Sequence, residues 1–236
     1  MRRILSFALA TAVSASCVTA GGKPYKEAER FRTEGKLADA KRAYQDALRT
    51  EPGNKTYQAR LSSLDEQIEL EVERLRGEAK EKEKASDWTG ASATYGQALD
   101  LKPGDADLAA RKALTAAKAK NLDPDAWFSE LEKILTQLPG NAVVERSMAG
   151  ARAGAYQYHV ALGAKLLEAG DGQAALGHYE RAKAIDASTP GWSTEQYDRA
   201  RALDLAAQAD LRVIAGDAVE AFDLLTKANE LWSNPE

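Results

Sequence analysis

Few residues in this chain of 236 amino acids have the types and spacing that catalysis needs. The two histidines, His159 and His178, fall on different predicted helices, and no His-Glu-x2-His pair supplies zinc ligands. The sequence holds neither a Gly-x4-Gly-Lys-(Ser/Thr) phosphate loop nor a Gly-x-Ser-x-Gly nucleophile elbow. We interpret Gly170-Asp171-Gly172 as a turn between helices. The sequence therefore predicts a protein that is not an enzyme, with no metal site and no cofactor.

The single cysteine, Cys17, could carry a covalent modification. It follows two arginines and an apolar run over residues 4–13, which is too short to span a membrane as a helix. This order is typical of a secretory signal peptide, and the ending Ser14-Ala15-Ser16-Cys17 resembles a bacterial lipobox, whose cysteine is lipidated. The alternative is ordinary cleavage after Ala20. In both cases no disulfide can form within the chain.

The lipobox resemblance implies an organisation and a location. We expect a signal peptide over residues 1–16, a short tether over 17–22 and one helical domain over 23–236. In lipoprotein sorting, Asp after the cysteine favours the inner membrane, so Val18 is compatible with an outer-membrane lipoprotein facing the periplasm of a bacterial envelope. The net charge of −4 and the lack of an evident basic face argue against a nucleic-acid partner.

Helix boundaries are marked by a repeated tripeptide. Pro52-Gly53-Asn54, Pro103-Gly104-Asp105 and Pro139-Gly140-Asn141 each follow an apolar run with helical spacing. Proline stops a helix, glycine allows the chain to turn, and Asn or Asp caps the next helix. No segment alternates apolar and polar residues as a strand does. The sequence therefore predicts an all-α protein built from helical hairpins.

The residues before these turns also repeat. The spacing Ala-x3-Tyr-x2-Ala places three residues on one helix face, where they are expected in the core of each hairpin. This pattern, most complete after Gly163 and Gly170, resembles the second helix of a tetratricopeptide repeat (TPR). The three copies are Ala40, Tyr44 and Ala47; Ala91, Tyr95 and Ala98; and Ala175, Tyr179 and Ala182. Over residues 23–236 the resemblance implies a right-handed α-solenoid of about five hairpins, the weaker copies containing Trp127, Leu131 and Ile134, and Ala221, Leu225 and Ala228.

Two first helices are expected to be longer than the first helix of a regular 34-residue TPR. The stretch from Asn54 to Ser86 holds no proline and its apolar residues keep a three-four spacing, which predicts a helix of about 30 residues and roughly 45 Å. The stretch from Asn141 to Ala169 is similar. A less favoured interpretation breaks these helices near Gly77 and Gly154.

Solenoids bind partners through an extended face made by successive first helices. The TPR register implies that this face is apolar toward the C-terminus, with candidate groove residues Val160, Ala164, Leu167, Glu168, Leu203, Ala207, Asp210, Val213 and Ile214. The alternative is that these residues are buried as core. The expected function is a non-catalytic, membrane-anchored scaffold for protein partners of the cell envelope. Two alternatives remain, a soluble periplasmic module for a small molecule or glycan, and a self-associating structural subunit.

Overall fold

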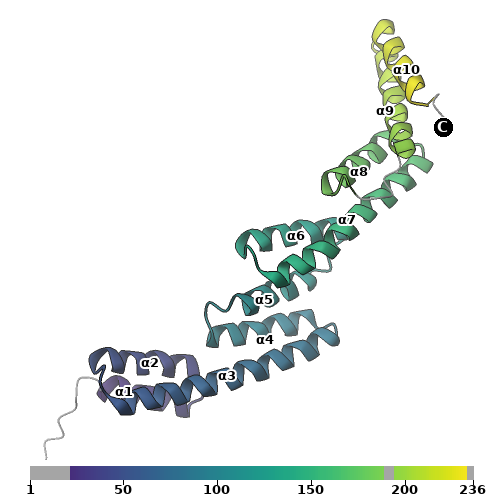
Figure 1. Cartoon of the computed structure of the whole chain (residues 1–236). Helices are drawn as coiled ribbons and strands as arrows, with labels where there is room; N and C mark the ends of the chain where they lie inside the picture. Colours follow the sequence, from purple (N-terminus) through teal and green to yellow (C-terminus); the bar gives the residue numbers. More distant parts are fainter. Residues whose placement is uncertain (1–21, 189–193, 233–236) are drawn as a thin grey trace, which may run out of the picture. The chain divides into compact units, whose positions relative to one another are not determined.

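The computed structural model describes residues 22–188 and 194–232, in which all regular secondary structure is helical (Figure 1). Hence the prediction of an all-α protein is confirmed. The predicted signal peptide, Cys17 and the tether to residue 21 lie outside the described residues. The ten helices of the described part are α1 (Gly22–Thr33), α2 (Leu37–Thr50), α3 (Lys55–Lys84), α4 (Trp88–Leu101), α5 (Ala106–Lys118), α6 (Pro124–Gln137), α7 (Ala142–Glu168), α8 (Gly172–Ile185), α9 (Thr194–Ile214) and α10 (Ala218–Trp232).

The helices begin where the sequence predicts. The side chains of Asn54, Asp105 and Asn141 accept hydrogen bonds from backbone N–H groups in the first turns of α3, α5 and α7. Gly104 and Gly140 take the left-handed conformation, with φ of 97° and 71°, whereas Gly53 does not. Both long helices are continuous, α3 over 30 residues and α7 over 27, so the interpretation that breaks them at Gly77 and Gly154 is wrong.

The chain forms two compact units. The first comprises the described residues up to Arg76 together with Gln97–Pro103. Its core contains Tyr44, which is buried and donates a hydrogen bond of 2.5 Å to Glu29. The ring of Tyr25 lies 5.8 Å from that of Tyr44 and 4.7 Å from that of Tyr57, so aromatic contacts join α1, α2 and the start of α3.

The second unit comprises Gly77–Gly96 and the described residues from Gly104 onward. In this unit α7 packs along α6 and α8, the first half of α9 packs on α8, and α10 runs beside α9 (Figure 1). The nine residues expected in the hairpin cores are all buried, across both units: Ala40, Tyr44, Ala47, Ala91, Tyr95, Ala98, Ala175, Tyr179 and Ala182. Burial raises the pKa of Tyr44 and of Tyr95 to about 12, aided in each case by a neighbouring carboxylate.

Candidate functional site

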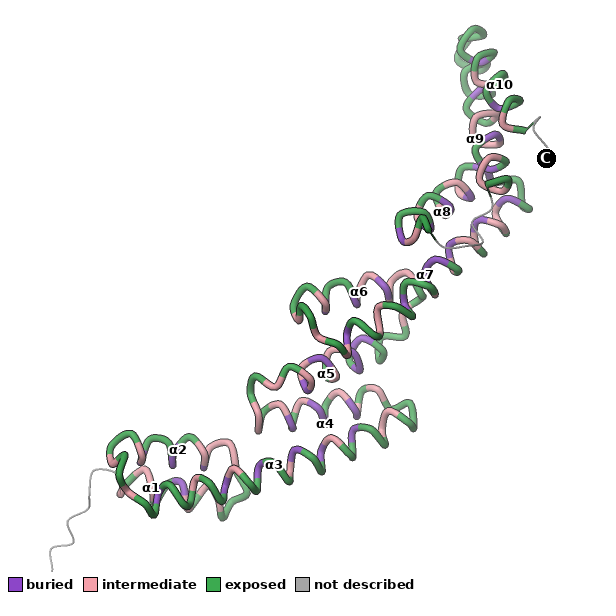
Figure 2. The backbone as a smooth tube through the Cα atoms, viewed as in Figure 1, coloured by how far each residue is buried: buried purple, intermediate pink, exposed green. Residues whose placement is uncertain are grey.

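The hairpin of α9 and α10 exposes an unusual amount of apolar surface. Seven of the eight large hydrophobic residues that are exposed in the described part belong to it, the other being Leu70 on α3. Most of the tube at the turn between α9 and α10 is coloured as exposed (Figure 2). The seven are Leu211, Val213, Ile214, Val219, Phe222, Leu225 and Trp232. A gathering of this kind on one element marks an interaction surface more often than scattered single residues do.

Part of this surface is a shallow groove between the two helices. It has a volume of about 250 Å³ and is lined by Ala202, Leu203 and Ala206 from α9 and by Leu225, Ala228, Asn229 and Trp232 from α10. Helical spacing continues it to Val213 and Phe222 near the turn. We call these nine residues the α9–α10 strip. From Ala202 to Val213 it extends along about 17 Å of helix.

Comparison with the preceding hairpin explains why the strip is open. Alignment of the turn glycines Gly170 and Gly216 places Val213, Phe222 and Leu225 at the positions of Leu167, Leu176 and Tyr179. In the α7–α8 hairpin, the packing partners of Leu167, Leu176 and Tyr179 are residues of α9. Ala200 lies at the contact, beside Tyr197 and Leu203. No described helix covers the corresponding positions of the α9–α10 hairpin, where the exposed fractions are 60%, 71% and 47%.

The predicted groove residues do not form one surface. Leu167 is only 5% exposed, and the prediction that it lines an open groove is wrong, because α8 and α9 cover the end of α7. Val160 and Ala164 are half-buried, Val160 against the core shared by α5 to α8, and Glu168 is exposed. On α9, Leu203 is half-buried, while the other four are exposed: Ala207, Asp210, Val213 and Ile214.

The sequence analysis missed the contribution of the second helix. It placed the groove on first helices alone and Leu225 in a hairpin core, whereas Phe222, Leu225 and Trp232 of α10 carry much of the exposed strip. Their spacing of three and seven residues puts them on one helix face, and this signal was available in the sequence.

A polar cluster joins α6, α7 and α8. His159 Nδ1 lies 2.8 Å from His178 Nδ1, and His159 Nε2 lies 3.3 Å from Asp125 Oδ1. Arg181 donates hydrogen bonds of 2.8 and 3.1 Å to the same carboxylate oxygen, and one of 3.4 Å to Ser129. The Ser129 hydroxyl therefore meets the guanidinium and not an imidazole, so the cluster is a clamp between helices and not an arrangement for nucleophilic attack.

The charges of this cluster are balanced around Asp125. Burial opposes ionisation of Asp125, but the hydrogen bond from Arg181 and the nearby His159 ring outweigh it and hold its pKa below the usual range. Burial and the adjacent His159 lower the pKa of His178, although Asp125 acts in the opposite direction. His159 Nε2 is buried and forms no hydrogen bond, so its 3.3 Å approach to Asp125 is a close contact and not a bond.

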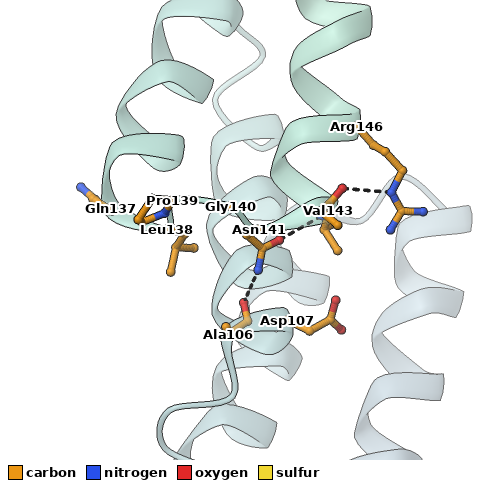
Figure 3. A pocket seen from close by; sticks show the side chains of 10 residues that line it. Ala106, Asp107, Gln137, Leu138, Pro139, Gly140, Asn141, Val143 and Arg146 are labelled. Carbon is orange, nitrogen blue, oxygen red and sulfur yellow. Dashed lines mark hydrogen bonds between the residues drawn. The ribbon is translucent and has the colours of Figure 1, made fainter.

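A second hollow lies at the turn between α6 and α7 and has a structural explanation. Its volume is about 480 Å³, and its lining includes Pro139, Gly140, Val143 and Arg146 (Figure 3). There Asn141 caps α7 and its Nδ2 donates a hydrogen bond of 3.0 Å to the carbonyl of Ala106 on α5. This hollow is the outer side of a helix junction, held by a capping residue that already has its partners.

Comparisons with known proteins leave the family open: no family model matches the sequence, and no curated protein matches it. Within the described ranges, no helix is long and apolar enough to cross a membrane. In the same residues, no group of three or more His, Cys, Asp or Glu side chains is placed to hold a metal ion.

Proposed function

We propose that this chain is a non-catalytic binding scaffold, a TPR-like α-solenoid whose C-terminal hairpin captures a protein partner. The observation that carries the proposal is the α9–α10 strip, which has the positions of a helix-packing surface and is left open. Exposed apolar residues lower the solubility of a protein. A continuous strip of them is therefore best explained by a partner that covers it. The repeated Ala-x3-Tyr-x2-Ala cores support the solenoid arrangement.

The location proposed is the bacterial cell envelope. The basic start, the apolar run of residues 4–13 and the lone Cys17 support a lipid-anchored protein, and Val18 is compatible with the outer membrane and its periplasmic side. Cys17→Ala is expected to abolish metabolic labelling with a fatty acid and to release the protein from membranes or leave the precursor unprocessed. Wild-type protein that takes no label and is cut after Ala20 would contradict the anchor.

The composition of the strip favours a protein partner over a glycan. Phe222 and Trp232 could each stack on a sugar ring, but between them the lining is mainly Ala and Leu, with Asn229 the polar side chain. Glycan recognition needs several hydrogen-bonding groups beside each stacking ring, whereas apolar side chains suit a protein surface.

The test of the scaffold is crosslinking in intact cells. A photo-crosslinking residue at position 207, exposed beside the strip, is expected to capture a defined envelope protein. Val213→Glu with Phe222→Glu should abolish that capture while helical content and melting temperature stay near wild type. The matched control is Leu70→Glu, an equally exposed leucine outside the hairpin, which should leave capture unchanged. Capture that survives the double substitution would exclude the strip as the binding site.

A further inference from the structure

The packing of α9 on α8 shows what kind of element fits the open strip. On the α7–α8 hairpin, the covering element is a single helix that presents Tyr197, Ala200 and Leu203. Ala200 is fully buried at the contact, and a Cβ on Gly172 would overlap the side chain of Leu203 and the backbone of α9. A small residue on each side of the contact therefore brings the two helices together, while larger apolar residues flank it.

We propose that the α9–α10 strip binds a basic amphipathic α-helix of the partner protein, which packs on this hairpin as α9 packs on α7–α8 but crosses it at the groove. This inference rests on the proposed scaffold function and names the chemistry of its partner. The exposed trio Val213, Phe222 and Leu225 stands at the positions that α9 covers one hairpin earlier, so a helix is the element that the surface is shaped to receive.

The crossing point on the strip is expected to shift. Ala218 replaces Gly172, and its methyl group would obstruct a helix placed as closely as α9 is. The small residues of the strip lie instead at Ala202, Ala206 and Ala228, around the groove between α9 and α10. The bound helix therefore approaches closest at the groove, with its small residue facing Ala206.

The charge of the hairpin selects the partner's polar face. Residues 194–232 carry eight carboxylates against four cationic side chains. Two of the four cations are engaged: Arg212 pairs with Glu220 at 3.4 Å, and Arg199 lies over the Trp232 ring at 5.2 Å. An exposed surface with this excess of negative charge attracts a cationic helix, and it opposes both a second copy of the same hairpin and an anionic lipid surface.

The experiment uses the processed chain and designed 18-residue helical peptides. All share the Tyr-x2-Ala-x2-Leu face of residues 197–203, and their outer faces carry either Lys or Glu. Titration is followed by the indole N–H resonance of Trp232, which lines the groove. The basic peptide is expected to bind at least tenfold more tightly than the acidic one, with an affinity that falls as salt is added. Ala206→Leu, which fills the groove without removing apolar area, should weaken binding at least tenfold, and Leu70→Glu should not change it.

Each other outcome overturns the inference. Equal binding of the two peptides excludes selection by charge, and tighter binding by Ala206→Leu shows only nonspecific adhesion of apolar surfaces. If cellular crosslinking through position 207 succeeds but no peptide binds, the scaffold proposal stands and the helical partner is wrong. A concentration-dependent dimer that Ala206→Leu disrupts identifies a second copy as the occupant, and sedimentation with phosphatidylglycerol vesicles identifies a lipid surface.

Discussion

The α7–α8 and α9–α10 hairpins are built on the same positional plan but differ in what covers them. In each, a glycine with positive φ ends the first helix, Gly170 at 82° and Gly216 at 83°. The inner alanines of the second helices are buried in both, whereas the flanking apolar residues are buried or half-buried only where α9 lies over them. The difference teaches that a repeat pattern determines the inside of a hairpin, while the neighbouring element decides whether its outer face is core or surface.

The largest effect expected from this comparison is for matched charge insertions. Leu167→Glu places an unpaired carboxylate in the α7–α8–α9 core and should cost more than about 3 kcal/mol of unfolding free energy. Val213→Glu, at the corresponding position one hairpin later, should change stability by no more than about 0.5 kcal/mol. Urea denaturation followed by circular dichroism measures both. Similar losses of unfolding free energy for the two variants would mean that Val213 is buried in the folded protein, as Leu167 is.

The two hairpins also differ in the sizes of two residues that face each other between their helices. A Cβ on Gly163 would lie 2.8 Å from Tyr179 Cε1, so Gly163→Ala should cost about 1–3 kcal/mol. The corresponding pair in the other hairpin is Ala209 with Leu225, where a smaller partner accompanies the added methyl group.

Gly163→Ala combined with Tyr179→Leu should therefore be less destabilising than the two single changes added together, by at least about 0.5 kcal/mol. The control is Gly177→Ala, in the same hairpin with open space around it, which should stabilise by about 0.5–1 kcal/mol. Strict additivity in this double-mutant cycle would show that Gly163 and Tyr179 do not compete for space.

The contact between His159 and His178 predicts that the stability of the α7–α8 hairpin depends on pH. Because the pKa of His178 is lowered in the folded protein, the unfolded chain binds more protons below the ordinary value of 6.5. The stabilising contribution of the neutral ring is therefore complete above about pH 6.5 and is lost as the pH falls toward the folded-state pKa. Unfolding free energies at pH 7.5 and 5.5 should show a decrease.

The other hairpin supplies the control for this pH effect. It has Leu205 and Leu224 at the positions of His159 and His178. The double substitution His159→Leu and His178→Leu should reduce the difference between the two pH values. If the wild type were more stable at pH 5.5, the folded protein would favour a protonated His178, contrary to its lowered pKa.

Much of the helical organisation followed from local chemistry. Asn54, Asp105 and Asn141 marked helix starts because capping depends on a few neighbouring backbone groups. The buried tyrosines followed from helix periodicity. By contrast, the burial of Leu167 depends on α9, which lies far along the chain, and local spacing carries no information on that contact.

The contacts of the two histidines could be predicted from the sequence only in part. His159 precedes the turn glycine Gly170 by eleven residues and His178 follows it by eight, so a hairpin brings the two helices together near these positions. Their approach could be expected from the antiparallel arrangement. Their contact with Asp125 could not, because it requires the packing of α6 against α7.

The smallest effect concerns the turn between α3 and α4, where a serine takes a backbone conformation that favours glycine. Ser86 has φ of 59° and stands where the other turns have Gly35, Gly170 and Gly216. The following Asp87 N–H donates a hydrogen bond of 2.9 Å to the Lys82 carbonyl, as Asp171 and Asp217 do to their own first helices. The turn geometry is therefore the same, and a side chain at Ser86 carries the strain of the left-handed conformation. Ser86→Gly should raise the unfolding free energy by about 0.5–1 kcal/mol, less than the relief of strain because glycine also gains freedom in the unfolded chain. Ser86→Ala keeps a Cβ and should give no such gain, so equal stabilisation by Ala and Gly would show that the serine hydroxyl, and not the backbone, is the source of the cost.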